Sequence, residues 1–174
     1  HVHAWGIPYT ATMLGIKQVY PGRYEPERLV QMIKDHKVTF SHCVPTILQM
    51  VLNAEGAKDF DFGGMRVIIG GSALNRSLYL AAKAKGMQLG AAYGMSETCP
   101  MISAGYLNLE LEQASEDEQI AHRIKAGVPG PLVEAQIMAA TPAAQTVEDA
   151  RASLQPEITT ARLARRQGPN PPGT

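Results

Sequence analysis

The sequence has few cysteines and no excess of either charge, and both shortages argue against whole classes of protein. Its 174 residues include two cysteines, Cys43 and Cys99, which form neither a Cys-x-x-Cys motif nor a Cys/His spacing typical of zinc sites. A disulfide framework and a zinc site are therefore not expected. Lys plus Arg and Asp plus Glu number 16 each. This balance argues against nucleic acid as a partner, because nucleic-acid-binding domains carry a basic surface.

Long apolar runs are also missing. None approaches the ~20 apolar residues that a transmembrane helix needs, and the chain does not open with a basic segment followed by an apolar one, as a signal peptide would. Together with the cysteine content, these absences predict a soluble cytoplasmic protein without a transmembrane segment. The first residue is His1 rather than Met, so we expect a processed piece or a fragment of a longer protein.

Three well-known site motifs are absent or broken. The chain has no Gly-x-Gly-x-x-Gly after a strand and no Walker phosphate-loop motif, so neither nucleotide-binding fold is indicated. A nucleophile elbow needs Gly-x-Ser-x-Gly, and the stretch from Gly94 to Thr98 has threonine where the last glycine is required. A serine hydrolase with Ser96 as its nucleophile is therefore the least favoured function.

The sequence contains an alternation of helix and strand patterns. The run from Met65 to Ile69 is almost entirely apolar and is closed by Gly70 and Gly71, as in a parallel strand buried on both faces. Two strands joined by a helix form a right-handed βαβ unit, so both strands point the same way. The predicted fold class is α/β, a partial parallel sheet flanked by helices. The expected helices cover residues 25–37, 45–54, 76–85 and 115–123, and the expected strands cover 38–44, 65–69, 87–92 and 133–138.

The composition changes near residue 138. From Ala139 to Thr174 the chain consists mainly of Ala, Thr, Gln, Arg and Pro, with few large apolar residues. Such a segment buries too little apolar surface to offset its conformational entropy. We therefore expect one partial domain over residues 1–138 and a low-apolar, disordered tail over residues 139–174.

Two segments rich in glycine and hydroxyl groups follow neighbouring predicted strands. One runs from Gly70 to Leu74 and the other from Tyr93 to Thr98. Because parallel strands end at the same edge of a sheet, both are expected at one rim, where open α/β sheets bind ligands. The glycines allow the backbone to approach a flat or anionic ligand. A plain structural alternative stays open, in which the glycines form turns, Ser96 caps a helix and Glu97 lies in its first turn.

The N-terminal stretch HVHAWGIPY combines two histidines with a tryptophan. It is interpreted as the packed start of an α/β unit, with lining of a ligand site as the less favoured alternative. A metal site is not expected here, because no carboxylate or cysteine lies close in sequence to complete a set of ligands.

Five motifs occur in the order HVHAWG, VPTILQMVL, GGSAL, YGMSET and KAGVPGP. In sequence and in separation they resemble the central part of the adenylate-forming (AMP-binding) superfamily, which includes acyl-CoA synthetases, luciferases and peptide-synthetase adenylation domains. The resemblance is strongest to medium- and long-chain fatty-acid–CoA ligases and covers about residues 1–138. The family signature is an aromatic residue, Gly, any residue, Thr and Glu, and Ser96 here stands where Thr is usual.

The resemblance implies roles for the residues at the rim. Gly70 to Leu74 would form one wall of an adenine pocket, with Ala73 replacing the usual proline, and Tyr93 with Gly94 would form the other. Ser96 would hydrogen-bond the α-phosphate and Glu97 would hold Mg²⁺, which makes these two the catalytic residues. The implied nucleotide-binding residues are Gly70, Gly71, Ser72, Ala73, Leu74, Tyr93, Gly94 and Ser96, and the implied acyl-pocket residues are His3, Trp5, Gly6, Val44 and Thr46.

The implied reaction is ATP-dependent ligation of a fatty acid to coenzyme A through an acyl-adenylate. Attack of the carboxylate on the α-phosphate of ATP builds negative charge on phosphate oxygens, so it needs a metal ion and hydrogen-bond donors rather than a protein nucleophile. The expected small-molecule partners are a fatty acid, ATP and coenzyme A, with Mg²⁺ as cofactor. The acyl chain length, the thiol acceptor and the oligomeric state, a homo-oligomer included, stay open.

Several parts of the family have no counterpart in the sequence. They are the Ser/Thr/Gly-rich phosphate loop, the Gly-Asp motif that binds ribose, the hinge, and the small C-terminal domain with its catalytic lysine. We therefore expect a fragment of an acyl-CoA synthetase that is inactive alone. The alternative is a non-catalytic module that binds an adenine nucleotide or an acyl chain, or one half of a split enzyme. A frame slip, a truncation or a gene fusion would account for the tail.

Overall fold

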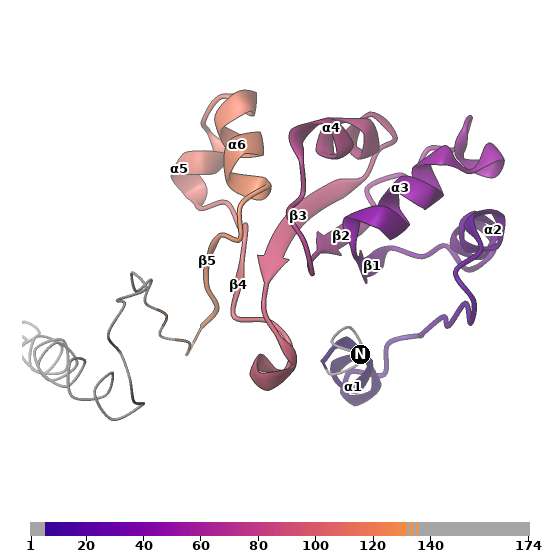
Figure 1. The fold of residues 1–174 in the computed structure, drawn as a ribbon, viewed down its shortest axis with the longest axis horizontal. Helices are drawn as coiled ribbons and strands as arrows, with labels where there is room; N and C mark the ends of the chain where they lie inside the picture. The colour runs from indigo at the N-terminus through magenta and orange to yellow at the C-terminus, as the bar shows by residue number, and fades with distance from the viewer. Residues whose placement is uncertain (1–5, 132, 134, 136–174) are drawn as a thin grey trace, which may run out of the picture. The chain divides into compact units, whose positions relative to one another are not determined.

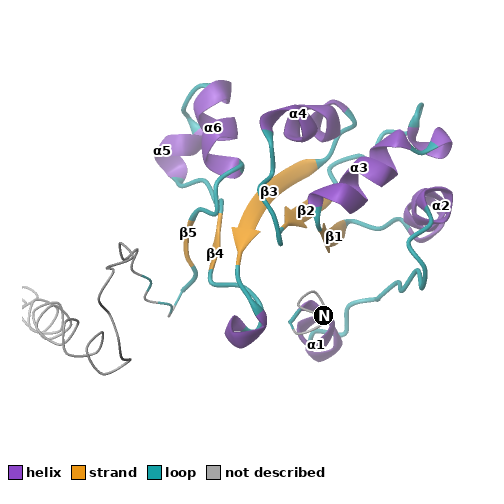
Figure 2. Ribbon diagram, in the orientation of Figure 1, coloured by secondary structure: helices purple, strands orange, loops and turns teal. Residues whose placement is uncertain are grey.

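The computed structural model of the chain describes residues 6–131, 133 and 135, which lie within the unit formed by residues 1–135. At its centre is a five-stranded sheet whose order in space, β1-β2-β3-β4-β5, equals the order in sequence (Figures 1 and 2). The strands are β1 (Phe40–Cys43), β2 (Arg66–Ile69), β3 (Gln88–Tyr93), β4 (Ser103–Ala104) and β5 (Val128–Pro129). The helices are α1 (Ile7–Met13), α2 (Pro26–His36), α3 (Pro45–Asn53), α4 (Arg76–Ala84), α5 (Leu109–Glu112) and α6 (Glu116–Arg123), with short 3₁₀ turns at Glu55–Ala57 and Ser96–Thr98.

The first three strands are parallel and the last two are antiparallel. The predicted parallel pairing of β2 and β3 is confirmed, with Val67 opposite Leu89 and Ile69 opposite Ala91. The mixed α/β class with flanking helices is confirmed as well. The antiparallel strands β4 and β5 were not predicted. A glycine at 127 is required because its φ is +75° and an added Cβ would lie 1.8 Å from the Ala104 carbonyl oxygen.

The predicted helices form where their end signals lie. In α2 the first residue is Pro26, whose missing N–H is harmless there, and the residue that caps the end of the helix, Lys37, adopts the left-handed conformation. In α4 the side chain of Asn75 accepts a hydrogen bond of 2.8 Å from the Leu78 N–H. Helix α6 begins with a capping box, since the Ser115 side chain accepts from the Glu118 N–H and the Glu118 carboxylate accepts from the Ser115 N–H.

The hydrophobic core lies on one face of the sheet. Buried residues of β2 and β3 pack against buried residues of α2, α3, α4 and α6, which gather on the same side of the sheet (Figure 1). The sheet contributes Val67, Ile69, Leu89 and Ala91, and the helices contribute Val30, Leu48, Val51, Leu78, Tyr79, Ala82 and Ile120.

The expectation that β2 is buried on both faces is wrong. Val67 and Ile69 are buried, but Arg66 is exposed and Ile68 is only partly buried. The reason is topological: the parallel strands follow one another in chain order, and right-handed crossovers that all run in the same direction place their helices on the same side. On the opposite side of the sheet Figure 1 shows α1.

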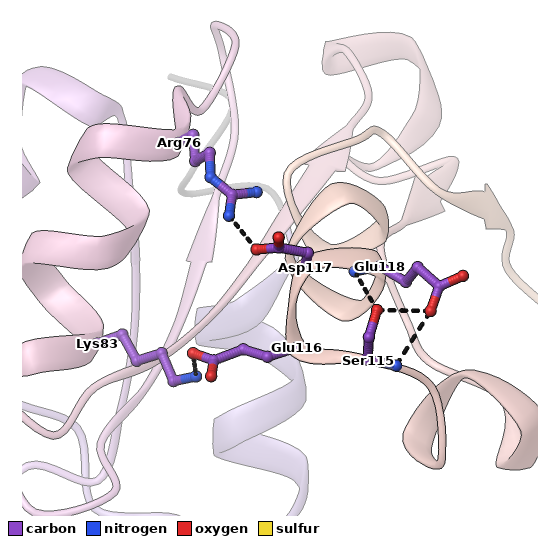
Figure 3. A network of polar contacts seen from close by, with 6 residues as sticks. All are labelled: Arg76, Lys83, Ser115, Glu116, Asp117 and Glu118. Atoms are coloured by element: carbon purple, nitrogen blue, oxygen red, sulfur yellow. Dashed lines mark hydrogen bonds and ion pairs between the residues drawn. The ribbon is translucent and has the colours of Figure 1, made fainter.

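Helix α6 is held against α4 by charge pairs as well as by apolar packing. Arg76 of α4 pairs with Asp117, and Lys83 pairs with Glu116 at 2.5 Å (Figure 3). Beside them, the hydrogen bonds from Ser115 lower the pKa of Glu118. The two ion pairs connect α4 to the segment that returns the chain to β5.

Two predictions fall wholly or mainly outside the described residues. The tail over residues 139–174 lies entirely outside them, and so does most of the strand expected over 133–138; Val133 and Ala135 are described and belong to no strand. Within the described part of the chain, no helix has the length and apolar character needed to span a membrane.

Candidate functional site

A cavity of about 270 Å³ lies at the carboxyl ends of the parallel strands. Because β1, β2 and β3 run in the same direction, the segments that leave them meet there, as the sequence predicted. The cavity is lined by Gly6, Ile7 and Thr10 near the N-terminus, by His42 and Ile68 of the sheet, by Gly70 and Gly71, by Ala92, Tyr93 and Gly94, and by Cys99, Pro100 and Met101. Four of the predicted nucleotide-binding residues, Gly70, Gly71, Tyr93 and Gly94, are thus brought together.

The end of β2 requires glycine at one position. Gly71 has a φ of +81°, which side-chain-bearing residues rarely adopt, and an added Cβ would lie 3.1 Å from Val44 Cγ1. Gly70 continues the ladder by donating its N–H to the Cys43 carbonyl at 3.1 Å. The two glycines therefore present bare backbone to the cavity.

The loop after β3 folds back on itself. An added Cβ at Gly94 would lie only 1.7 Å from the Pro100 carbonyl oxygen. The approach that this glycine permits is therefore, first of all, that of the chain's own backbone. A glycine is therefore needed here to let the loop fold back. Gly94 also lines the cavity.

Thr98 organises this loop, and the sequence reasoning missed it. Its Oγ1 accepts a hydrogen bond of 3.0 Å from the Met95 N–H and lies 2.9 Å from the Pro100 carbonyl, to which the hydroxyl donates. The available signal was its position directly after the signature. A hydroxyl residue there can close the turn with its own side chain.

Ser96 and Glu97 lie on the 3₁₀ turn within this loop, and both are exposed. The Ser96 backbone carbonyl accepts a hydrogen bond of 3.3 Å from the Cys99 N–H, so Ser96 takes part in the turn through its backbone. Neither residue is among those lining the cavity. Both stand on the segment that joins Gly94 to Cys99, two of the lining residues.

The remaining predicted nucleotide residues take two different positions. Ser72 and Ala73 are exposed beyond the end of β2, whereas Leu74 is 3% exposed and belongs to the hydrophobic core. The Leu74 side chain therefore anchors the Gly70–Leu74 segment in the hydrophobic core and is not accessible to solvent.

The residues predicted for the acyl pocket are also divided. Gly6 lines the cavity, whereas His3 and Trp5 lie outside the described residues. Val44 contacts the Gly71 position from the side, and Thr46 is exposed on α3. His42 was not predicted, although alternation along β1 places it on the face that carries Ile68, to which it is paired in register.

The two cysteines have opposite environments. Cys43 lies at the end of β1, where burial raises the pKa of its thiol from 9.0 to about 12, slightly opposed by a hydrogen bond from the Leu48 backbone. Cys99 is exposed and lines the cavity. The Cys43 thiol is therefore neutral at ordinary pH.

The acidic groups do not form a closed metal site. Among the described residues, no group of three or more His, Cys, Asp or Glu side chains is placed to hold a metal ion. A single carboxylate such as Glu97 fits a different arrangement, in which Mg²⁺ is bound by one or two carboxylates and by the phosphates of a nucleotide.

Comparison with known proteins points to one family. The pattern of the family described as AMP-binding enzyme matches residues 1–148. The long-chain-fatty-acid–CoA ligase of Thermus thermophilus is 37% identical over 141 residues, which cover 79% of this chain and 26% of that protein. The medium-chain-fatty-acid–CoA ligase of Ectopseudomonas oleovorans is 32% identical over 141 residues, with the same two coverages. The chain thus spans about a quarter of the length of the curated relatives it matches.

The fold has solved counterparts too. The N-terminal domain of FACL13 from Mycobacterium tuberculosis superposes with a TM-score of 0.61 at 19% identity, covering 73% of this chain and 30% of that one. At 19% identity this similarity concerns the fold alone, and it agrees with the α/β class described above.

Proposed function

Because the chain belongs to the AMP-binding enzyme family, we propose that its glycine-lined rim supplies part of the ATP site of a fatty acyl-CoA ligase. In that reaction a fatty-acid carboxylate attacks the α-phosphorus of ATP, the bond to pyrophosphate breaks, and the acyl-adenylate then transfers its acyl group to the thiol of coenzyme A with release of AMP. The observation that carries the proposal is the meeting of Gly70 and Gly71 with Tyr93 and Gly94 in one cavity.

The adenine of ATP is assigned to the space between the segment that follows β2 and the segment that follows β3. Tyr93 is 51% exposed at the end of β3, so a face of its ring is accessible for stacking. Gly70 and Gly71 offer bare backbone on the other side, and Ser72 and Ala73 continue that wall. A flat, apolar base with polar edges suits such a slot.

Ser96 and Glu97 are assigned to the phosphates. The Ser96 hydroxyl is a donor that can hydrogen-bond an α-phosphate oxygen, where negative charge develops during the attack. The Glu97 carboxylate would hold Mg²⁺ jointly with the nucleotide phosphates. When bound, the metal neutralises charge on the phosphate oxygens. No protein nucleophile is required, which agrees with the broken nucleophile-elbow motif.

The fatty acid is assigned to the part of the cavity nearest α1. Ile7, Ile68 and Met101 give it an apolar lining, and Gly6 lines it as well. We place the acyl chain there and the carboxylate toward Ser96.

We propose further that the chain alone does not complete the reaction. One hydroxyl and one carboxylate are few groups for a triphosphate that carries several negative charges. The 141 residues that match the Thermus thermophilus relative cover 26% of that protein, and the motifs for the phosphate loop, the ribose and the catalytic lysine are not among the residues of this chain. The expected activity of the isolated chain is therefore nucleotide binding without ligation.

A titration of nucleotides into the purified chain tests the assignment. We expect AMP to bind in the absence of metal, and ATP binding to strengthen when Mg²⁺ is added. Ser96→Ala should weaken both, whereas Glu97→Gln should remove the gain from Mg²⁺ and leave AMP binding unchanged. Glu110→Gln, an exposed carboxylate on α5, is the matched control. Equal effects of Glu97→Gln and Glu110→Gln would contradict the role of Glu97.

An activity assay tests the incompleteness. The chain is incubated with a fatty acid, ATP, Mg²⁺ and coenzyme A, and pyrophosphate and acyl-CoA are measured. We expect neither product above background. Formation of acyl-CoA by the purified chain, abolished by Ser96→Ala, would show that the chain is a complete ligase.

A further inference from the structure

We propose that His42 binds the carboxylate of the fatty acid at the point where the acyl and nucleotide parts of the cavity meet. This inference rests on the proposed function and deepens it, because it names a further substrate-contacting residue for the same reaction. None of the five motifs that indicate the family contains His42. The observation behind the inference is that His42 lines the cavity from β1.

The reaction requires the carboxylate to be held close to another anion. Its oxygen attacks the α-phosphorus of ATP, whose phosphates are negatively charged, so the two reactants repel each other. A carboxylate that leaves water for a cavity also loses hydrogen bonds, and this loss is offset only if the protein supplies a donor. Holding the carboxylate in the geometry of attack lowers the barrier. The cavity therefore needs a hydrogen-bond donor where the carboxylate lies.

Few side chains of the described lining can serve as that donor, since these lining residues include neither Lys nor Arg. Tyr93 is assigned to the adenine, and the Thr10 hydroxyl donates to the Gly6 carbonyl at 3.4 Å. Cys99 carries a thiol, which is a weak donor. The imidazole of His42 has two ring nitrogens, so it can keep a partner within the protein and still donate to a ligand. His42 is therefore the strongest candidate in this lining.

The position of His42 fits the junction of the two ligands. Register pairs it with Ile68, which belongs to the part of the cavity assigned to the acyl chain. The next residue of this chain segment on the same face is Gly70, the first residue of the wall assigned to the adenine. Its N–H donates to the Cys43 carbonyl at 3.1 Å, so the end of β1 lies beside both parts. A fatty acid whose chain lies on Ile68 would have its carboxylate next to His42.

The surroundings hold the imidazole at the cavity. Strand β1 is paired with β2 over its whole length, from Phe40 to Cys43. Cys43 packs against the hydrophobic core, so its neighbour His42 points to the other side of the sheet. The start of α1 closes against the loop after β3, since an added Cβ at Gly6 would lie 2.5 Å from Pro100 Cδ. A hydrogen bond to a carboxylate is screened less in such a walled site than on an open surface.

Binding of two matched ligands tests the proposal. The full 174-residue chain is titrated with decanoate and with decan-1-ol, which have the same alkyl chain length and differ in the charged group. We expect His42→Ala to weaken decanoate binding about tenfold or more, as for a hydrogen bond to a charged group, and to leave decan-1-ol binding nearly unchanged. His42→Gln, which keeps a donor, should lose less. Ile68→Ala should weaken both ligands alike, because it removes apolar contact alone.

A control variant and a spectroscopic measurement accompany the titration. His122→Ala is the matched control, since His122 is an exposed histidine on α6 that does not line the cavity, and it should change the binding of neither ligand. Circular dichroism verifies that each variant folds. In nuclear magnetic resonance spectra, the imidazole signal of His42, assigned by its loss in His42→Gln, should shift with decanoate more than with decan-1-ol.

The outcomes separate this proposal from the ATP site. The proposal is overturned if decanoate does not bind, if His42→Ala weakens both ligands alike, or if it weakens neither. Titration with AMP reports on the nucleotide site independently. A selective loss of decanoate binding in a chain that does not bind AMP would reject the ATP site and keep the carboxylate site. Binding of AMP together with no selective effect of His42→Ala would do the reverse.

Discussion

The two cysteines show how position alone makes chemically identical groups different. Cys43 is held under α3 at the end of β1 and Cys99 is exposed at the cavity. Since the thiolate is the reactive form, the buried thiol should be inert and the exposed one accessible. Titration with Ellman's reagent should therefore detect one thiol in the folded chain and two in denaturant, and Cys99→Ser should abolish the reaction of the folded chain. Two reactive thiols in the folded chain would contradict the packing of β1.

The same buried thiol predicts a loss of stability at high pH. Well below pH 9 the thiol is protonated in both the folded and the unfolded chain and contributes nothing to the pH dependence. Between pH 9 and about 12 the unfolded thiol loses its proton while the folded one keeps it, so the free energy of unfolding falls. The slope approaches about 1.4 kcal/mol per pH unit. Chemical unfolding of Cys43→Ala, compared with the parent chain at pH 8, 9 and 10, should lack this component; parallel curves would contradict it.

Gly94 is a residue whose position leaves no room for a side chain. Gly94→Ala would place a methyl group on the Pro100 carbonyl, so the loop that carries Ser96 must move. We expect a cost of roughly 1–3 kcal/mol, as for overpacking. Gly90→Ala is the control, because its Cβ would lie 3.8 Å from the nearest atom and alanine suits a strand better than glycine. Urea unfolding of both variants measures the difference, and equal stabilities would argue against the folded-back loop.

At the scale of elements, helix α4 joins the core to the segment around α6. Its N-cap is a single hydrogen bond, from the Leu78 N–H to the Asn75 side chain. Asn75→Ala should reduce the free energy of unfolding by about 1 kcal/mol, whereas Asn75→Asp, which keeps the acceptor, should not. Both variants are compared by urea denaturation. A loss shared by the two would mean that Asn75 acts through something other than its cap.

The ion pairs between α4 and α6 should contribute less than this cap. The Lys83 and Glu116 side chains are 44% and 67% exposed, so solvent screens their attraction. We expect Lys83→Gln to cost under about 1 kcal/mol and the difference to shrink in about 1 M salt. Thermal unfolding at low and high salt checks this. A larger, salt-independent loss would show that Lys83 acts through the packing of its aliphatic part instead.

At the scale of the whole molecule, the sequence predicted the parallel core and the rim well. Proline at the first turn, caps and β-branched runs are local signals, and they placed α2, α3, α4 and β1 to β3 within two residues or so of their observed ends. Strands of two residues, such as β4 and β5, are too short to leave a pattern. The sequence also did not predict that only one face of the sheet is buried. An apolar run such as that around Ile68 does not reveal whether helices cover one face of the strand or both. The domain boundary at residue 138 and the roles of Ser96 and Glu97 remain predictions.

The identity between strand order in space and strand order in the chain has a consequence for how the molecule is made. Among the five strands of the described residues, each pairs with the one synthesised just before it, so none of these five has to insert between two that are already joined. The sheet can therefore grow during translation by addition at one edge, with β2 joining β1 as soon as it leaves the ribosome and β3 following. Because each loop closes over a short stretch of chain, the entropy lost at each addition stays small.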